Sequence, residues 1–268
     1  EARAIGTSDI GNVSLRATHA IVLETLERSV GSRACRQELW NVSQMTGWQV
    51  DHGYLVTIQP VGTADARREA LARWRALPRY VDTEIANLRE GLKLGYTSPT
   101  LAVRIVIDQV SALISSPAAD LPFLSPVRRD EDLEFDRAFT GLVTGELIPA
   151  FTRYRDFLEH EYLPGAREAI AVTANPDGAS CYASLIRDHS SLPERPSDVH
   201  ALGLEQIDRL TAEMAAIGER SFQTSDVPAL LQVLRTNRRY MFGNRDDLIA
   251  YTEAALARAK REIPKYFN

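Results

Sequence analysis

Residues 196–218 read PSDVHALGLEQIDRLTAEMAAIG, and this stretch is the most informative part of the chain. Pro196 suits the first helical position, Asp198 puts negative charge in the first turn, and Gly218 suits a helix end. The stretch predicts one long amphipathic helix, and core packing is the ordinary explanation of its apolar stripe, because periodicity alone carries no chemistry. The stripe recurs at steps of three and four and consists of Val199, Leu202, Leu204, Ile207, Leu210, Met214 and Ile217.

The same periodicity runs through most of the chain. Residues 10–47 read as helices, with Gly31 closing the first and Gly47 interrupting the second. Pro149 should kink or split the long helix that begins near Asp132. Further helix starts are predicted from capping residues and prolines at Asp65, Pro78, Ser98-Pro99, Asp226 and Asn244.

Two stretches depart from the helical pattern. Tyr54–Ile58 has strand propensity, but an isolated strand has no partner here, so residues 48–60 are expected to be irregular. Residues 115–131 hold three prolines and form the longest expected loop, a possible boundary inside an otherwise single domain or half-domain of residues 1–268. We therefore predict an all-α fold, an irregular array of roughly 9 to 11 helices with little or no sheet.

Composition excludes several classes of protein. Of 268 residues, 44% are hydrophobic and 25% charged, with a net charge of −5, which is ordinary for a globular chain. No basic run is interleaved with aromatic residues, so we expect no nucleic-acid partner. No apolar run approaches the ~18 residues of a membrane span. Two cysteines neither require nor exclude a disulfide, and Cys181 is expected to be a buried inert thiol.

The histidines do not form a zinc motif. His160-Glu161 is followed by Pro164 where the second histidine of His-Glu-x-x-His belongs, and that spacing is what places two imidazoles on one helical face. A remote pair such as His189 with His200 remains possible, although surface or capping roles explain scattered histidines more simply. The sequence therefore predicts neither a catalytic residue nor a metal or cofactor site in this chain.

Several landmarks in one order resemble a known family. The 196–218 helix and these landmarks are similar to a bacterial family catalogued as domain of unknown function 885, whose members resemble zinc metallopeptidases of the helical gluzincin type. The landmarks are residues 77–80, LPRY; 87–92, NLREGL; 95–99, GYTSP; 162–167, YLPGAR; Asp177-Gly178 with Cys181-Tyr182; and 263–267, IPKYF.

The resemblance implies a function that this chain does not carry alone. Family members have a metal-binding His-Glu motif with a following Gly-His downstream of the Pro-Lys-Tyr-Phe landmark, and Asn268 precedes that position. The chain is thus expected to be the helical substrate-cleft portion of a peptide-hydrolysing protein that uses zinc when complete. Expected partners are a peptide substrate and either the missing C-terminal half or another copy, covering apolar surface near residues 263–267. The alternative is a non-catalytic binding or scaffold module. The resemblance favours the periplasm or cell envelope over the cytoplasm.

Four residues are candidates for substrate binding. Tyr182, Arg187 and His189 precede the 196–218 helix, and His200 lies within it. In the resembled family this neighbourhood is expected to line the cleft. Arg187 suits bidentate binding of a peptide carboxylate, and Tyr182 suits donation to a substrate carbonyl. The simpler alternative is that Tyr182 and Arg187 pack a junction between helices.

Overall fold

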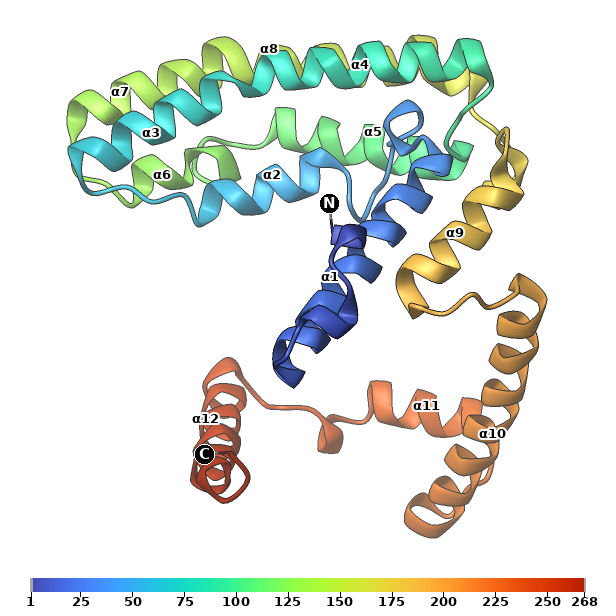
Figure 1. Cartoon of the computed structure of the whole chain (residues 1–268). Helices are drawn as coiled ribbons and strands as arrows, with labels where there is room; N and C mark the ends of the chain where they lie inside the picture. Colours follow the sequence, from blue (N-terminus) through green and yellow to red (C-terminus); the bar gives the residue numbers. More distant parts are fainter. Residues whose placement is uncertain (1, 268) are drawn as a thin grey trace. The chain divides into compact units, whose positions relative to one another are not determined.

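The computed structural model describes residues 2–267 and confirms the all-α class (Figure 1). Helices α1 to α12 account for most of these residues, and the described part contains no strand, only an isolated bridge between Pro99 and Arg167. Contacts divide the chain into two units, Glu1–Pro196 and Ser197–Asn268. Residues 115–131 lie inside the first unit.

The first unit is built around a pair of long, neighbouring helical arms. Helices α3 (Ala64–Arg75) and α4 (Leu77–Leu94) run beside α7 (Leu133–Leu142) and α8 (Ile148–Phe157), as Figure 1 shows. Their facing sides bury large side chains, each of which contributes about 1.5–3 kcal/mol by leaving water. The fully buried members include Trp74, Val81, Leu88, Phe139, Phe151 and Tyr154.

Helix α5 (Thr100–Ser115) packs against α8, and α2 (Trp48–Thr57) packs against residues 122–128, which contain α6 (Ser125–Arg128). The prediction that residues 48–60 are irregular was wrong. The Trp48 ring lies 5.2 Å from that of Phe151 and makes the first turn of α2 part of the core. Tertiary packing thus outweighs the local strand propensity.

Two other local predictions need correction. The apolar residues before Gly47 form no second helix, but a 3-10 turn at Gln37–Leu39 followed by turns, in which Leu39 and Val42 are buried individually. Helix α5 begins at Thr100 with Pro99 as its N-cap, so Ser98 is not the cap. The Ser98 hydroxyl donates to the Trp40 carbonyl instead.

The predicted disturbance at Pro149 takes the form of a widened turn. A π-helical turn at Val143–Leu147 joins α7 to α8 immediately before this proline. Proline lacks an N–H and clashes with the preceding helical turn. The wider π-helical turn accommodates both effects, so α8 follows α7 without a break in the helical path. A second π-helical turn at Leu158–Tyr162 follows α8 and precedes Pro164.

Helices α1 (Val13–Ser32) and α9 (Gly178–Ser190) pack together and complete the first unit. The expectation of a free thiol at Cys181 was wrong, because Cys181 forms a disulfide with Cys35. Their Cα atoms are 4.5 Å apart, within the range that a disulfide requires, although 146 positions separate them in sequence.

The second unit contains α10 (Pro196–Phe222), α11 (Val227–Thr236) and α12 (Arg245–Glu262). Asp226 and Asn244 are side-chain N-caps as predicted. Gly218 does not end α10. Its missing Cβ admits the Thr224 carbonyl oxygen, which would lie 2.4 Å from a Cβ at this position. The apolar stripe of α10 is exposed.

The closing residues of the described chain are also exposed, Tyr266 by 77% and Phe267 by 72%. Within residues 2–267, none of the helices combines the length and the apolar character that crossing a bilayer requires.

Candidate binding groove

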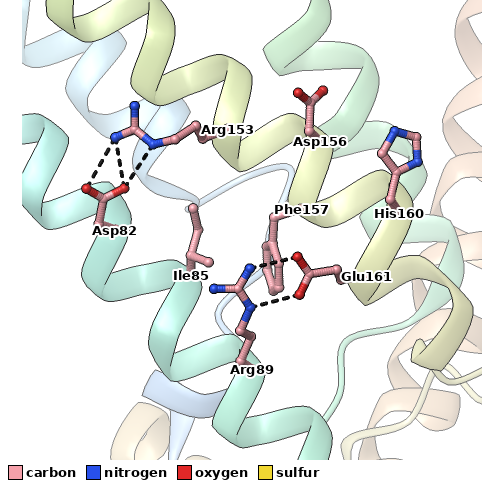
Figure 2. A pocket seen from close by; sticks show the side chains of 8 residues that line it. All are labelled: Asp82, Ile85, Arg89, Arg153, Asp156, Phe157, His160 and Glu161. Atoms are coloured by element: carbon pink, nitrogen blue, oxygen red, sulfur yellow. Dashed lines mark hydrogen bonds and ion pairs between the residues drawn. The ribbon is translucent and has the colours of Figure 1, made fainter.

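An open groove of about 500 Å3 lies along α4 and α8, and Figure 2 shows the side chains that line it. Helix α4 supplies Asp82, Ile85 and Arg89. These positions are three and four apart, so they share one face of the helix. Ile85 is buried and belongs to the core together with Val81 and Leu88, so packing of α4 holds Asp82 and Arg89 in place at the edge of the core.

The other wall comes from α8 and the π-helical turn after it. Arg153, Asp156 and Phe157 lie on α8, and His160 and Glu161 follow in the turn Leu158–Tyr162. Phe157 is buried at the floor, whereas the charged groups stand at the rim. The sequence folds this way because aromatic residues of α8 alternate with charged ones at helical spacing.

Two arginine–carboxylate pairs bridge the walls (Figure 2). Arg89 donates from Nε and Nη2 to the two Glu161 carboxylate oxygens, at 2.8 and 2.7 Å. Arg153 donates from Nη2 to both oxygens of Asp82, at 2.9 and 3.2 Å. Each of the four side chains is about half exposed, at 49–54%. Exposed pairs of this kind contribute only about 0–1 kcal/mol to stability.

The electrostatics of the groove follow from these pairs. The hydrogen bond from Arg89 lowers the pKa of Glu161 from its usual value, so the carboxylate is charged at neutral pH. The Arg89 guanidinium also lies 5.1 Å from the centre of the Phe157 ring, a favourable cation–π distance. The groove thus offers both signs of charge beside an apolar floor, a combination suited to peptide groups.

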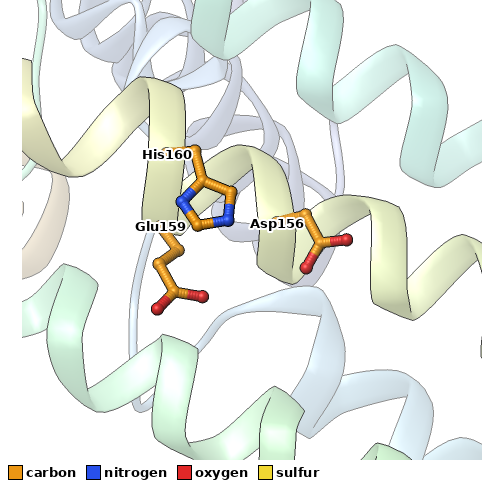
Figure 3. A group of neighbouring side chains, drawn as sticks. All are labelled: Asp156, Glu159 and His160. Carbon is orange, nitrogen blue, oxygen red and sulfur yellow. The ribbon is translucent and has the colours of Figure 1, made fainter.

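Asp156, Glu159 and His160 form the one group of possible metal ligands found among the described residues (Figure 3). Their ligand atoms lie within 4.8 Å of one another, because positions three and four apart share a helix face. Glu159 and His160 are exposed, and Asp156 already accepts a 2.7 Å bond from Arg155. A set with one histidine does not fit the two-histidine zinc site of the resembled peptidases.

A buried carboxyl lies on α4 away from the groove. Glu84 is 8% exposed, and burial raises its pKa although Asn41 and Tyr80 hydrogen-bond to it. The same burial, with Glu84 nearby, raises the pKa of Tyr80 to about 12. This pair sits beside a cavity of about 250 Å3 lined by His52, Trp74 and Tyr80. Hydrogen bonds from Asn41 and Tyr80 satisfy Glu84, and Tyr80 lies at the solvent-exposed edge of the core, so the pair has a structural explanation.

The substrate-binding candidates chosen from sequence lie elsewhere. Tyr182 and His189 are exposed on one face of α9, seven positions apart. Arg187 lies on another side of α9 and is ion-paired with Glu24 and Glu27 of α1, at 3.2 and 3.5 Å. His200 is an exposed residue of α10 in the second unit. The structure therefore brings Tyr182 and His189 to one face and directs Arg187 toward α1.

Sequence reasoning missed the groove. Charged residues repeat at three, four and seven positions on α4 and α8, but this repetition is typical of any solvated helix surface and does not indicate a groove. Only the packing of α4 against α8 places Arg89 opposite Glu161, which is 72 positions away. Long-range pairing of this kind leaves no local trace in either helix.

Comparison with known proteins identifies relatives of the chain. The model of the family described as "Bacterial protein of unknown function (DUF885)" matches residues 2–268. Among curated proteins none matches. Among solved structures, a protein described as a "putative lipoprotein" from Colwellia psychrerythraea superposes with a TM-score of 0.75 at 16% identity. The match covers 84% of this chain and 41% of that one, so the likeness shows the fold and the chain spans about two fifths of this neighbour.

Proposed function

The chain belongs to the bacterial DUF885 family, and from this premise we propose that it is the helical, substrate-binding portion of a zinc-metallopeptidase-like protein. In this proposal the complete protein hydrolyses peptide bonds, and the zinc is held by residues other than those described here. The described residues bind and orient the peptide along the groove between α4 and α8. They carry out no chemical step themselves.

The observation that carries the proposal is the make-up of the groove. Arg89 and Arg153 offer donors to carbonyl and carboxylate oxygens, and Asp82, Asp156 and Glu161 offer acceptors to amide and ammonium groups. Ile85 and Phe157 supply an apolar floor on which a peptide side chain can lie. An extended peptide presents these three kinds of group in alternation along its length.

We place the protein in the periplasm or cell envelope. A buried disulfide between Cys35 and Cys181 supports this location, because structural disulfides persist in oxidising compartments and are rare in the cytosol. The description of the Colwellia psychrerythraea neighbour as a lipoprotein agrees with it.

Peptide binding by the chain tests the groove. A fluorescein-labelled peptide library of mixed charge should show saturable anisotropy changes, and Arg89→Ala should weaken binding about tenfold by removing a charge-assisted contact. Lys93→Ala is the matched control, since Lys93 is an exposed cation of α4 paired with Glu90 and does not line the groove. Equal binding by both variants and the parent chain would remove the groove from the proposal.

Hydrolysis is tested on the complete protein rather than on these residues alone. The zinc-loaded complete protein should cleave peptides, and Arg89→Ala should lower kcat/KM without lowering the zinc content. Peptide binding without any cleavage would instead assign the chain to a non-catalytic binding module.

A further inference from the structure

Arg167 occupies an unusual electrostatic position in the first unit. Its backbone is held on both sides, since its N–H donates to the Ser98 carbonyl at 3.2 Å and its carbonyl accepts from Thr100 N at 2.8 Å. The side chain is partly buried, and its guanidinium lies over the Trp40 ring, 5.6 Å from the ring centre. The peptide chain thus fixes this cation in one place.

No carboxylate among residues 2–267 forms an ion pair with Arg167. Its guanidinium donates to the carbonyl oxygens of Thr97 and Ile170, while Nε is buried without any hydrogen-bond partner. Burial lowers the pKa of Arg167, and the Tyr162 phenol, rather than a carboxylate, opposes this shift. A partly buried, unpaired cation is costly, and an unsatisfied buried donor adds to that cost. Such a group is well explained by an anionic ligand.

The space beside Arg167 can hold such a ligand. A pocket of about 320 Å3 is lined by Arg167, Trp40, Ser98, Leu101 and Ile170, among others. Most of this lining is apolar, and Leu101 and Ile170 lie at its open side, 63% and 77% exposed. The pocket therefore combines one cation with apolar walls.

The N-terminus of α5 forms part of the same wall. The helix begins at Thr100, and Pro99 at its N-cap makes no side-chain hydrogen bond. The hydroxyl of Ser98, which could have capped it, points to the Trp40 carbonyl. The first turn of α5 carries partial positive charge, which adds to the attraction that Arg167 exerts on an anion. Part of this turn is already engaged, since Thr100 donates from its N–H to the Arg167 carbonyl and from its hydroxyl to Glu168.

We propose that this pocket binds an organic carboxylate attached to an apolar group, and that its ligand is the C-terminal carboxylate of a peptide. The identification of the carboxylate as a peptide terminus rests on the proposed function, whereas the pocket's preference for an apolar carboxylate does not. The carboxylate meets the Arg167 guanidinium, whose side chain lines the pocket, and the last side chain of the peptide lies between Leu101 and Ile170.

A pair of probes matched in shape but different in charge tests the pocket. N-acetyl-leucine and N-acetyl-leucinamide differ only in the carboxylate, and titration calorimetry at neutral pH should show at least about tenfold tighter binding of the acid. Arg167→Gln should abolish this preference, and Arg68→Gln, an exposed arginine of α3, should retain it. Equal affinity for both probes, or no binding of the acid, overturns the proposal.

A second test leaves Arg167 in place, because this side chain also donates hydrogen bonds to the Thr97 and Ile170 carbonyls and its removal could disturb the fold. Leu101→Glu places a carboxylate at the pocket in the first turn of α5, where negative charge is favourable for the helix. It should block N-acetyl-leucine, and the neutral Leu101→Gln should not. Equal binding by these two variants contradicts the proposal.

A short peptide with a free or amidated C-terminus identifies the source of the carboxylate. If the peptide with the free C-terminus binds and the amidated peptide does not, the ligand is a peptide terminus. If neither peptide binds although N-acetyl-leucine does, that identification is overturned. Because Arg89 does not line this pocket, Arg89→Ala reports on the groove independently.

Discussion

Cys35 and Cys181 are joined by a disulfide that closes a span of 146 positions and fastens α9 to the turn after α1. Because both cysteines are buried and no free cysteine exists in the described chain, reduction affects this bond alone. Replacing both cysteines by serine should lower the free energy of unfolding by about 2–5 kcal/mol, since a long unfolded loop regains freedom. Calorimetry with and without reductant measures this loss, and an unchanged Tm would contradict it.

Asp130 should make stability depend on pH in the acid range. Its carboxylate is 1% exposed and accepts hydrogen bonds from Arg67 and from Gly62 N, and the Arg67 bond holds its pKa well below the usual range. The native pKa is lower than the unfolded value of about 3.9. The contribution is therefore fully present above the unfolded pKa and is lost as pH falls through the folded one.

Asp130→Asn tests this sign. At neutral pH the variant should have a lower free energy of unfolding than the parent. The difference between the two free energies should narrow steadily as pH falls below about 4. Urea unfolding at several pH values measures both free energies. A difference that is constant down to the acid range would show that the charge of Asp130 contributes nothing.

Gly91 should tolerate no side chain. A Cβ there would lie 1.8 Å from the Leu39 carbonyl oxygen and 2.9 Å from that of Tyr96, both backbone atoms that cannot move away cheaply. Gly91→Ala should cost about 1–3 kcal/mol or more by overpacking. Gly53→Ala in α2 is the control, because nothing lies within 4 Å of its Cβ and alanine should stabilise the helix by about 0.5–1 kcal/mol. Similar losses in both variants would refute the close-approach argument.

Arg187 remains a predicted substrate-binding residue with a structural alternative. Its pairs with Glu24 and Glu27 are partly exposed, so Arg187→Ala should cost no more than about 1 kcal/mol of stability. If Arg187 binds substrate, the affinity for peptide falls while Tm hardly changes. A drop in Tm of several degrees with unchanged affinity assigns Arg187 to the packing of α1 on α9.

The isolated chain should hold no zinc tightly. Glu159 and His160 are exposed, and Asp156 is shared with Arg155, so the three ligands are neither preorganised nor desolvated. Elemental analysis after dialysis should find less than one zinc per chain. One retained zinc that His160→Ala removes would contradict this expectation.

Helix starts were predictable from sequence where the cap is local. Asp132, Asp226 and Asn244 each accept bonds from N–H groups two or three positions ahead, so a short window contains all the relevant atoms. The C-terminal end of α4 depends on local residues in the same way, because Gly95 follows the helix with a φ of +80°, a conformation that favours glycine. Apolar periodicity then indicated the all-α class, because it too depends on neighbours within one or two turns.

Tertiary structure alone decided the features that join distant residues. Residues 48–57 are helical because Trp48 and Val56 enter a core whose other members lie up to about a hundred positions away. The groove exists because α4 packs on α8. In the described part of the chain, Arg167 forms no ion pair because its neighbours in the fold are Trp40, Tyr162 and backbone carbonyls. Sequence spacing determines which side chains share a helix face, but not which face meets another, since that choice depends on the burial of the whole chain.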